Sequence, residues 1–194
     1  MPRSSWDGKE YIRFLIGKIK PKSALDVGAG AGTYRDLLDI PHFDAVEIWA
    51  PYVERFGLID AYREVFIEDV RRFAFDREKY DLIIFGDVLE HMTKNEAISV
   101  VSRALHSGAM VLVSIPIIDY PQGECDGNPF EAHVKPDWSH EEFVEAFGPH
   151  IAVGNNHGII GIYMLSIGDK DRIRAAHLEI TADNHEFRLL EVPI

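Results

Sequence analysis

The chain has 194 residues, of which 46% are hydrophobic and 27% are charged. That composition is typical of a globular domain and excludes a wholly disordered chain. The formal net charge of −12 disfavours partners with a phosphate backbone and anionic membrane surfaces. The single cysteine, Cys125, excludes an intrachain disulfide, and the sequence shows neither a signal peptide nor an apolar run of membrane-spanning length. We therefore expect a cytoplasmic protein that binds neither nucleic acid nor membranes.

Strand-like and helix-like segments alternate through the first 115 residues. Apolar residues recur at helical spacing over residues 9–19, and Pro21 ends that pattern. The predicted strands are 23–27, 42–49, 62–67, 80–85 and 109–115, and further helices are predicted at 33–38, 52–56 and 95–105. Because crossover helices join parallel strands, this alternation predicts an α/β fold, with a parallel sheet covered by helices on both faces.

The chain changes character after Pro116. Residues 116–138 are rich in proline and glycine, and we interpret them as a long ordered loop of the kind that often carries function. Ser139 and Glu142 form a capping-box pattern before a predicted helix at 141–147. Two late strands are expected at 151–153 and 159–167, joined by a hairpin turn at 154–158. Residues 169–194 are polar and receive no assignment.

The sharpest motif is LDVGAGAGTY, residues 25–34, which ends a predicted strand and opens a predicted helix. Glycines allow a tight turn there and let a ligand approach backbone N–H groups. Gly28, Gly30 and Gly32 are spaced G-x-G-x-G, so that Thr33 stands where the dinucleotide fingerprint has its third glycine. Asp26 would repel a pyrophosphate and would favour a ligand that carries an ammonium group.

Carboxylates follow the next strands as well. Glu47 lies near the end of the second predicted strand, where a carboxylate can accept hydrogen bonds from both ribose hydroxyls. Asp69 and Val70 follow the third strand, where they can bond an adenine ring through a carboxylate and a backbone N–H. The ribose contact also occurs in NAD sites, so Glu47 indicates a nucleoside without choosing the cofactor.

The order LDVGAGAG, AVEIW, EDV, YDLIIFGDVLEHM and GAMVLVSIP resembles the successive motifs of class I, Rossmann-like methyltransferases. The resemblance implies S-adenosyl-L-methionine as cofactor. It also implies a three-layer α/β/α sandwich whose seven-stranded, mostly parallel sheet has its last strand antiparallel. We expect one methyltransferase domain over 1–194, with an N-terminal helix (1–22), a core (23–168) and a C-terminal extension (169–194).

Carried over by position, the resemblance places the methionine moiety against Asp26, Gly28 and Gly30, the ribose against Glu47, and the adenine against Asp69 and Val70. Asp87, after the fourth strand, would face the reactive end of the cofactor. We also expect Ala29 and Ile48 to bind the cofactor.

A hydroxyl acceptor needs a general base, and histidine suits that role. His91 and His133 are the candidates; each has a structural alternative, in which it only fixes a loop by hydrogen bonds. Glu131 is expected to orient His133 or to bind the substrate. Trp138 either stacks on a sugar or aromatic acceptor or anchors the following helix.

No metal is expected, because the nine histidines show no clustered ligand spacing. A partial site from Asp87, Glu90 and His91 with His133 is the alternative.

The leading interpretation is methyl transfer to O or N of a small molecule or a glycan, by a monomer or a homodimer. An NAD-dependent enzyme is disfavoured by the missing third glycine and by Asp26. A non-catalytic S-adenosylmethionine-binding partner subunit remains open. A protein or tRNA methyltransferase is disfavoured by the acidic charge and by Gly86–Leu89, which replaces an N/D-P-P-Y type motif.

Overall fold

The apolar runs of the chain assemble into one central sheet. The computed structural model describes residues 5–189 and 191–192, and within them the sheet has seven strands in the order β3-β2-β1-β4-β5-β7-β6. The strands are β1 (Ser23–Val27), β2 (His42–Val46), β3 (Val65–Phe66), β4 (Leu82–Gly86), β5 (Met110–Pro116), β6 (Ile151–His157) and β7 (Ile160–Leu165). The first five pair in parallel, whereas β7 is antiparallel to both β5 and β6. The expected reversed last strand is therefore confirmed.

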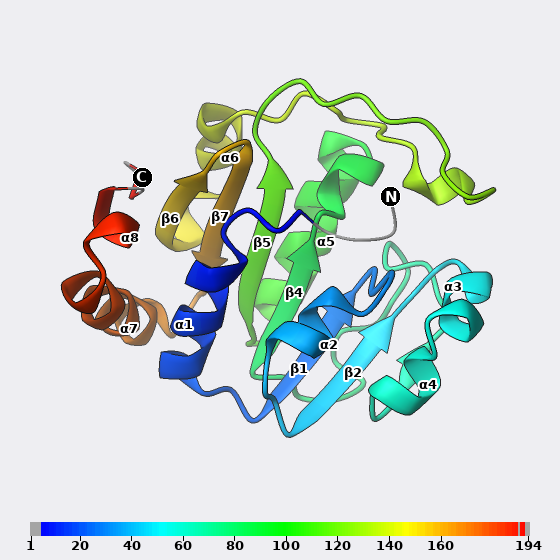
Figure 1. The fold of residues 1–194 in the computed structure, drawn as a ribbon, viewed down its shortest axis with the longest axis horizontal. Coiled ribbons are helices and arrows are strands. Elements are labelled where there is room, and N and C mark those ends of the chain that lie inside the picture. Colours follow the sequence, from blue (N-terminus) through cyan, green and yellow to red (C-terminus); the bar gives the residue numbers. More distant parts are fainter. Residues whose placement is uncertain (1–4, 190, 193–194) are drawn as a thin grey trace.

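Helices cover both faces of this sheet (Figure 1). They are α1 (Lys9–Ile19), α2 (Thr33–Leu37), α3 (Ala50–Arg55), α4 (Leu58–Ala61), α5 (Lys94–His106), α6 (His140–Phe147), α7 (Lys170–Asp183) and α8 (His185–Leu189). Three short 3-10 turns complete the described elements: η1 (Leu89–His91), η2 (Pro129–Glu131) and η3 (Gly148–His150). None of the helices in the described part of the chain is both long and apolar enough to cross a bilayer.

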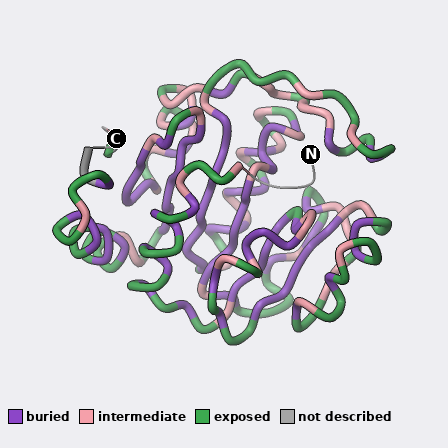
Figure 2. The backbone as a smooth tube through the Cα atoms, in the orientation of Figure 1, coloured by how far each residue is buried: buried purple, intermediate pink, exposed green. Residues whose placement is uncertain are grey.

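Successive residues of each central strand point to opposite faces, which creates two apolar cores. In β4, Leu82 and Ile84 belong to one core, and Ile83 and Phe85 belong to the other. Side chains of α1, α2 and α7 close the first core, and those of α5 and α6 close the second. Figure 2 shows the buried strands between these layers. The three-layer α/β/α architecture predicted from the sequence is thus confirmed.

The second predicted strand is shorter than expected, since β2 ends at Val46 and not at residue 49. Further differences from the sequence-based prediction concern β3, the hairpin turn and the C-terminal residues. β3 contains only Val65 and Phe66, because Tyr62 still belongs to the end of α4, and Arg63 forms a single backbone hydrogen bond to Phe43 of β2. The side chains of Tyr62 and Arg63 bind carboxylates of neighbouring strands. The predicted hairpin is confirmed, but its turn is shorter than 154–158, since β6 continues to His157. Gly154 serves packing there: a Cβ on it would lie 3.1 Å from the Tyr163 ring. The C-terminal residues without a prediction form α7 and α8.

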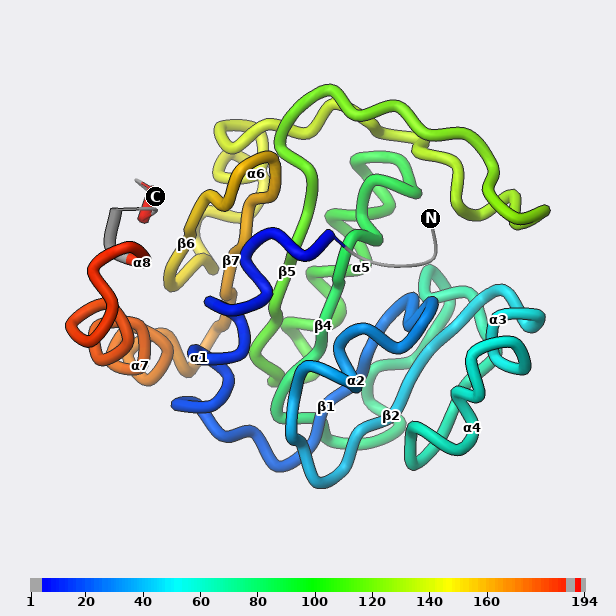
Figure 3. The backbone as a smooth tube through the Cα atoms, in the orientation of Figure 1, coloured from blue at the N-terminus to red at the C-terminus, as the bar shows by residue number. Residues whose placement is uncertain are grey.

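The long ordered loop predicted after Pro116 lies between β5 and α6 and crosses over the carboxyl ends of the strands (Figure 3). It is attached to the body of the protein by backbone hydrogen bonds. The N–H groups of Val134 and Lys135 donate to the carbonyl of Glu90 in η1, at 2.8 and 2.9 Å. The ring of Phe130 meets the ring of Trp49 edge-on, with centroids 6.1 Å apart. These contacts hold the loop over one end of the sheet.

Candidate active site

A cavity of about 350 Å³ lies between the carboxyl ends of the parallel strands and the loop after β5. In an open α/β sheet, ligands bind at the carboxyl ends of the parallel strands. Connections that start there run to opposite faces of the sheet, and a crevice forms between two such connections. Its walls come from the turn after β1, the ends of β2 and β4, η1 and the crossing loop. Most of the site residues predicted from the sequence line it: Gly28, Ala29, Gly30, Glu47, Ile48, Asp69, Val70, Asp87, His91, Glu131 and His133.

The turn after β1 needs its glycines. Gly28 and Gly30 have φ values of 65° and 51°, in the left-handed region that side chains disfavour. A Cβ on Gly28 would also come within 2.8 Å of a methyl group of Val88, across the cavity wall. The turn is fixed by the N–H of Gly28, which donates to the carbonyl of Val46 at 2.8 Å. The backbone of the turn is therefore open to a ligand, whereas a side chain at Gly28 would fill the space in front of it.

Glu47 is held in place by two backbone donors. Its carboxylate accepts hydrogen bonds from the N–H groups of Gly30, at 2.9 Å, and Trp49, at 2.8 Å. Burial raises the pKa of Glu47, and these backbone hydrogen bonds oppose that shift. The carboxylate lines the cavity beside the glycine turn. An oriented acceptor at this point has the chemistry needed to bind the hydroxyls of a ribose.

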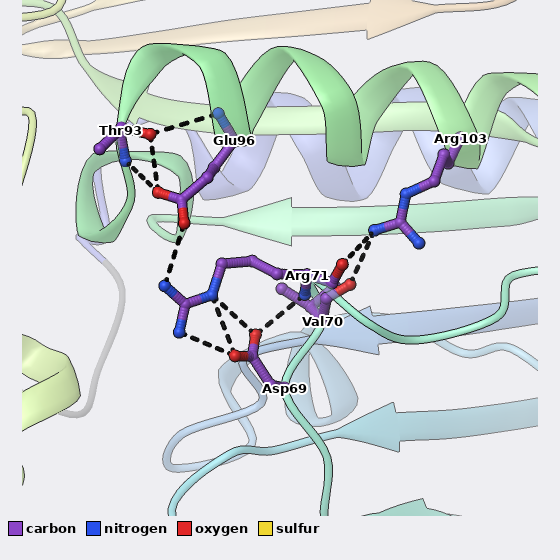
Figure 4. A network of polar contacts seen from close by, with 6 residues as sticks. All are labelled: Asp69, Val70, Arg71, Thr93, Glu96 and Arg103. Atoms are coloured by element: carbon purple, nitrogen blue, oxygen red, sulfur yellow. Dashed lines mark hydrogen bonds and ion pairs between the residues drawn. The ribbon is translucent and has the colours of Figure 1, made fainter.

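Asp69 and Val70 lie on a loop that α5 holds from outside the cavity (Figure 4). Arg71 donates to Asp69 through both its backbone N–H and its guanidinium, and the pKa of Asp69 is lowered mainly by that side-chain hydrogen bond. The guanidinium of Arg71 also reaches Glu96, which forms a capping box with Thr93 at the start of α5. This network fixes the position of Asp69 at the rim.

The structure places Asp26 apart from the other predicted cofactor residues. Its carboxylate accepts a 2.5 Å hydrogen bond from the hydroxyl of Tyr62, and it does not line the cavity. Alternation along β1 explains this, because Leu25 and Val27 face the α5 side while Asp26 faces the layer of Tyr62 and Lys9. The contact of Asp26 with a methionine moiety stays a prediction.

Asp87 connects the end of β4 to two neighbouring segments. It adopts a left-handed conformation, with φ of 56°. Its carboxylate accepts hydrogen bonds from the N–H of Ser5, at 2.8 Å, and from the hydroxyl of Ser114 in β5, at 3.1 Å. The N-terminal segment before α1 thereby reaches the cavity, where Ser5 is one of the lining residues.

His91 and His133 lie together at the other side of the cavity, with ring centroids 4.8 Å apart. Nδ1 of His91 lies 3.2 Å from the carbonyl of Ala132, and Nδ1 of His133 lies 2.5 Å from the carbonyl of Tyr120. Burial is the main cause that lowers the pKa of both histidines. Both rings are therefore neutral at pH 7, and the predicted pair of bases is brought into one site.

The two predicted substrate residues separate. Glu131 is 9% exposed and lines the cavity next to His133. Trp138 is buried away from the cavity, and its ring contacts Phe143 of α6 with centroids 6.2 Å apart. That position agrees with the interpretation of Trp138 as an anchor for the helix. A contact of Trp138 with a substrate stays a prediction, and Trp138 does not line the cavity.

Four further loop residues line the cavity that the sequence did not single out: Tyr120, Gln122, Asn128 and Phe130. The amide of Gln122 donates to the carbonyl of Glu131 at 2.7 Å, and Asn128 accepts from the N–H of Phe130. Their spacing follows no helical or strand period, so no local pattern could indicate which side chains face inward. An aromatic residue on a proline-rich loop was the available signal.

Comparison with known proteins gives a consistent picture. A sequence model of the methyltransferase domain matches residues 25–113, which include the glycine turn, Glu47, Asp69 and His91. None of the curated protein sequences matches the chain. Solved structures do share its fold, at identities below one fifth.

Three of these structures illustrate the likeness. The DhpI complex with S-adenosylhomocysteine (SAH) has a TM-score of 0.63 and 17% identity, and the alignment covers 82% of this chain and 83% of that one. The methyltransferase domain of bacterial CtHen1 has a TM-score of 0.58 and 19% identity, over 82% and 97% of the two chains. A putative O-methyltransferase from Nostoc punctiforme has a TM-score of 0.56 and 16% identity; 80% of this chain is covered, but only 55% of that one.

Proposed function

We propose that the chain is a class I, Rossmann-like methyltransferase that uses S-adenosyl-L-methionine, and that it methylates O or N of a small molecule or a glycan. The observation that carries the proposal is one cavity that holds the glycine turn, the carboxylates of Glu47 and Asp69, and a pair of neutral imidazoles. One end of the cavity has the hydrogen-bond donors and acceptors that suit a nucleoside. The other end has groups that suit a methyl-accepting substrate with an ionisable proton.

The residues at the first end fit the cofactor. A Cβ on Gly28 would collide with Val88, and Gly30 has a positive φ, so the turn leaves backbone against which an amino-acid moiety can lie. Glu47 would bind the ribose hydroxyls, with Ile48 beside it, and Asp69 and Val70 would bind the adenine. Asp87 would face the reactive end. When bound, the cofactor supplies an electrophilic methyl group on a sulfonium sulfur.

What remains for the chain is to place the acceptor and to remove its proton. Nδ1 of His133 faces the Tyr120 carbonyl, and a carbonyl can only accept, so the proton is on Nδ1 and the lone pair is on Nε2. His91 is arranged in the same way against the Ala132 carbonyl. Either Nε2 can take the proton of an acceptor hydroxyl as general base. Tyr120, Phe130 and Glu131 would contact the acceptor from the loop.

Calorimetry with S-adenosylmethionine, S-adenosylhomocysteine and NAD tests the cofactor. We expect the first two to bind and NAD not to bind. Glu47→Ala should weaken binding by about 1–3 kcal/mol, because a buried acceptor of hydrogen bonds is lost. Glu54→Ala, on the exposed side of α3, is the control and should bind normally. Binding of NAD alone, or an unchanged affinity in Glu47→Ala, would contradict the proposal.

Turnover on a panel of hydroxylated aromatic compounds and sugars tests the transfer. His133→Ala should reduce the rate and leave the cofactor dissociation constant unchanged. A wild-type rate in that variant would remove His133 as base. Tight binding of the cofactor with no product from any acceptor would instead support a non-catalytic binding subunit.

A further inference from the structure

Three potential metal ligands converge at the acceptor end of the cavity. Glu90 and His91 come from η1, whereas His133 comes from the loop after β5. Each offers one ligand atom, and the three atoms lie within 4.8 Å of one another. Metal–ligand bonds to nitrogen and oxygen are about 2.0–2.2 Å long, so two ligands of one cation lie at most about 4.4 Å apart. Side-chain shifts of a few tenths of an ångström would therefore bring all three atoms to one cation.

Both histidines have the tautomer that a metal ligand requires. The backbone carbonyls of Ala132 and Tyr120 face Nδ1 of His91 and His133, so each Nδ1 carries its proton. The lone pair of each ring is then on Nε2. A metal-bound histidine usually donates a hydrogen bond from its other ring nitrogen to a group such as a backbone carbonyl, which orients the ring.

Glu90 supplies an independent observation that points to a ligand. The residue is 2% exposed, and its Oε2 has no hydrogen-bond partner within the described residues. A buried carboxylate oxygen without a partner is rare, because its lost hydration must be replaced by a donor or a cation. A bound cation would supply the missing partner of Oε2.

The three residues are held together without a cation. The carbonyl of Glu90 accepts hydrogen bonds from the N–H groups of Val134 and Lys135, the two residues that follow His133. The N–H of His133 itself donates to the carbonyl of Gln122 at 2.9 Å. The backbone on both sides of the cluster is therefore fixed, and binding would need little rearrangement.

We propose that Glu90, His91 and His133 bind a divalent first-row transition-metal ion, such as Zn²⁺ or Co²⁺. Two imidazoles and one carboxylate favour these ions over Mg²⁺ and Ca²⁺, which prefer oxygen ligands. Three protein ligands leave open positions toward the cavity. This departs from the expectation of no metal, which rested on local spacing, because His133 lies 42 positions after His91 in the sequence.

The role of the cation rests on the proposed function, although its binding does not. If the acceptor lies against the two histidines, a hydroxyl in an open position of the cation would be acidified by it. His91 and His133 would then act as ligands, and the acceptor proton would leave to solvent once the cation had lowered the hydroxyl pKa. Asp87 is not required as a ligand, because both of its carboxylate oxygens accept hydrogen bonds within the protein.

Titration of the untagged, metal-stripped protein with CoCl₂ tests the site, by calorimetry and by the visible absorption of bound Co²⁺. We expect one Co²⁺ per chain, and competition by ZnCl₂. Glu90→Gln and His133→Ala should each weaken binding by about 100-fold, because each removes a ligand. His42→Ala, an exposed histidine at the start of β2, is the control and should bind as the wild type does.

Co²⁺ should also raise the melting temperature of the wild type and of His42→Ala, but not that of His133→Ala. Similar melting temperatures of all variants without metal show that the substitutions leave the fold intact. The proposal would be overturned if Co²⁺ did not bind, or if the Glu90 and His133 variants bound it as the wild type does. It would also be overturned if the protein bound Mg²⁺ but not Co²⁺. Calorimetry with S-adenosylmethionine is measured separately, so loss of cofactor binding alone contradicts the proposed function and leaves the metal site intact.

Discussion

The ammonium of Lys9 donates a 2.6 Å hydrogen bond to the hydroxyl of Tyr34, and both residues are buried. The same ammonium lies 4.2 Å from the centroid of the Tyr34 ring. Burial lowers the pKa of Lys9, and the charges of Asp87 and Asp26 oppose that shift. The pair links the start of α1 to α2, next to carboxylates at the ends of β1 and β4.

Replacing Lys9 with methionine keeps the length of the side chain and removes the donor. The Tyr34 hydroxyl then loses a buried partner, so Lys9→Met should lower the free energy of unfolding by about 1–3 kcal/mol. Lys18→Met is the matched control on α1. Its ammonium forms only a surface ion pair with Glu179, so a change below about 1 kcal/mol is expected. Equal losses in urea unfolding of the two variants would contradict the inference.

Asp26 should make stability depend on pH. Burial raises its pKa from 3.8 to about 7, while the hydrogen bond from Tyr62 and the charge of Lys9 lower it. The folded state thus holds the proton more tightly than the unfolded chain does. The stabilisation is complete below the unfolded pKa and is lost as the pH rises through the folded one, by up to about 4 kcal/mol.

Asp26→Asn keeps an acceptor for Tyr62 and cannot ionise. Relative to this variant, the wild type should lose stability between about pH 4 and pH 8. Urea unfolding at several pH values measures the difference, and a difference that stays constant with pH would exclude Asp26 as its source.

The sheet could be predicted because its strands carry their own signal. The apolar runs at 23–27 and 109–115 are buried on both faces and correspond to β1 and β5 within one residue at each end. The bounds of β3 could not be predicted, since Tyr62 belongs to the end of α4 and the side chains of Tyr62 and Arg63 bind the carboxylates of Asp26 and Asp44. Such contacts join residues far apart in the sequence and leave no local period.

Gly86 and Gly17 provide a matched pair of glycine substitutions. A Cβ on Gly86 would overlap the Tyr34 ring, so Gly86→Ala should lower the free energy of unfolding by about 1–3 kcal/mol. Gly17 lies in α1 with open space around it, and Gly17→Ala should raise that free energy by about 0.5–1 kcal/mol. Thermal unfolding should shift in opposite directions. A stabilised Gly86→Ala would show that Tyr34 can move aside without cost.

The candidate site was predictable in part for a similar reason. Residues that follow strands, such as Glu47 and Asp69, must meet at one edge of a parallel sheet, and both line the cavity. Whether a residue inside a strand reaches the cavity depends on the face of the sheet to which its side chain points. Asp26 lies inside β1 one residue before its end, so the pleat turns it away from the cavity toward Tyr62. The meeting of His133 with Glu90 depends on the path of a loop without periodic sequence.

Arg103 should control cofactor affinity without lining the cavity. From α5 its guanidinium donates to the carbonyls of Arg71, at 3.0 Å, and Val70, at 3.1 Å (Figure 4). It also donates to the carbonyl of Phe73, at 2.8 Å. These bonds hold the loop that carries Asp69. Arg103→Met keeps much of the apolar stem and removes all three, so the adenine-binding edge should become mobile. Affinity for S-adenosylhomocysteine is expected to fall about 10-fold, equivalent to about 1.4 kcal/mol.

Arg72→Met is the control for this change, because Arg72 is an exposed arginine of the same loop. Calorimetry should give a wild-type dissociation constant for it. Hydrogen exchange of the amides in residues 69–75 should accelerate in Arg103→Met and not in Arg72→Met, since only the first loses the bonds that order the loop. Faster exchange with unchanged affinity would mean that the cofactor does not depend on this edge, and the assignment of Asp69 and Val70 to the adenine would then have to be withdrawn.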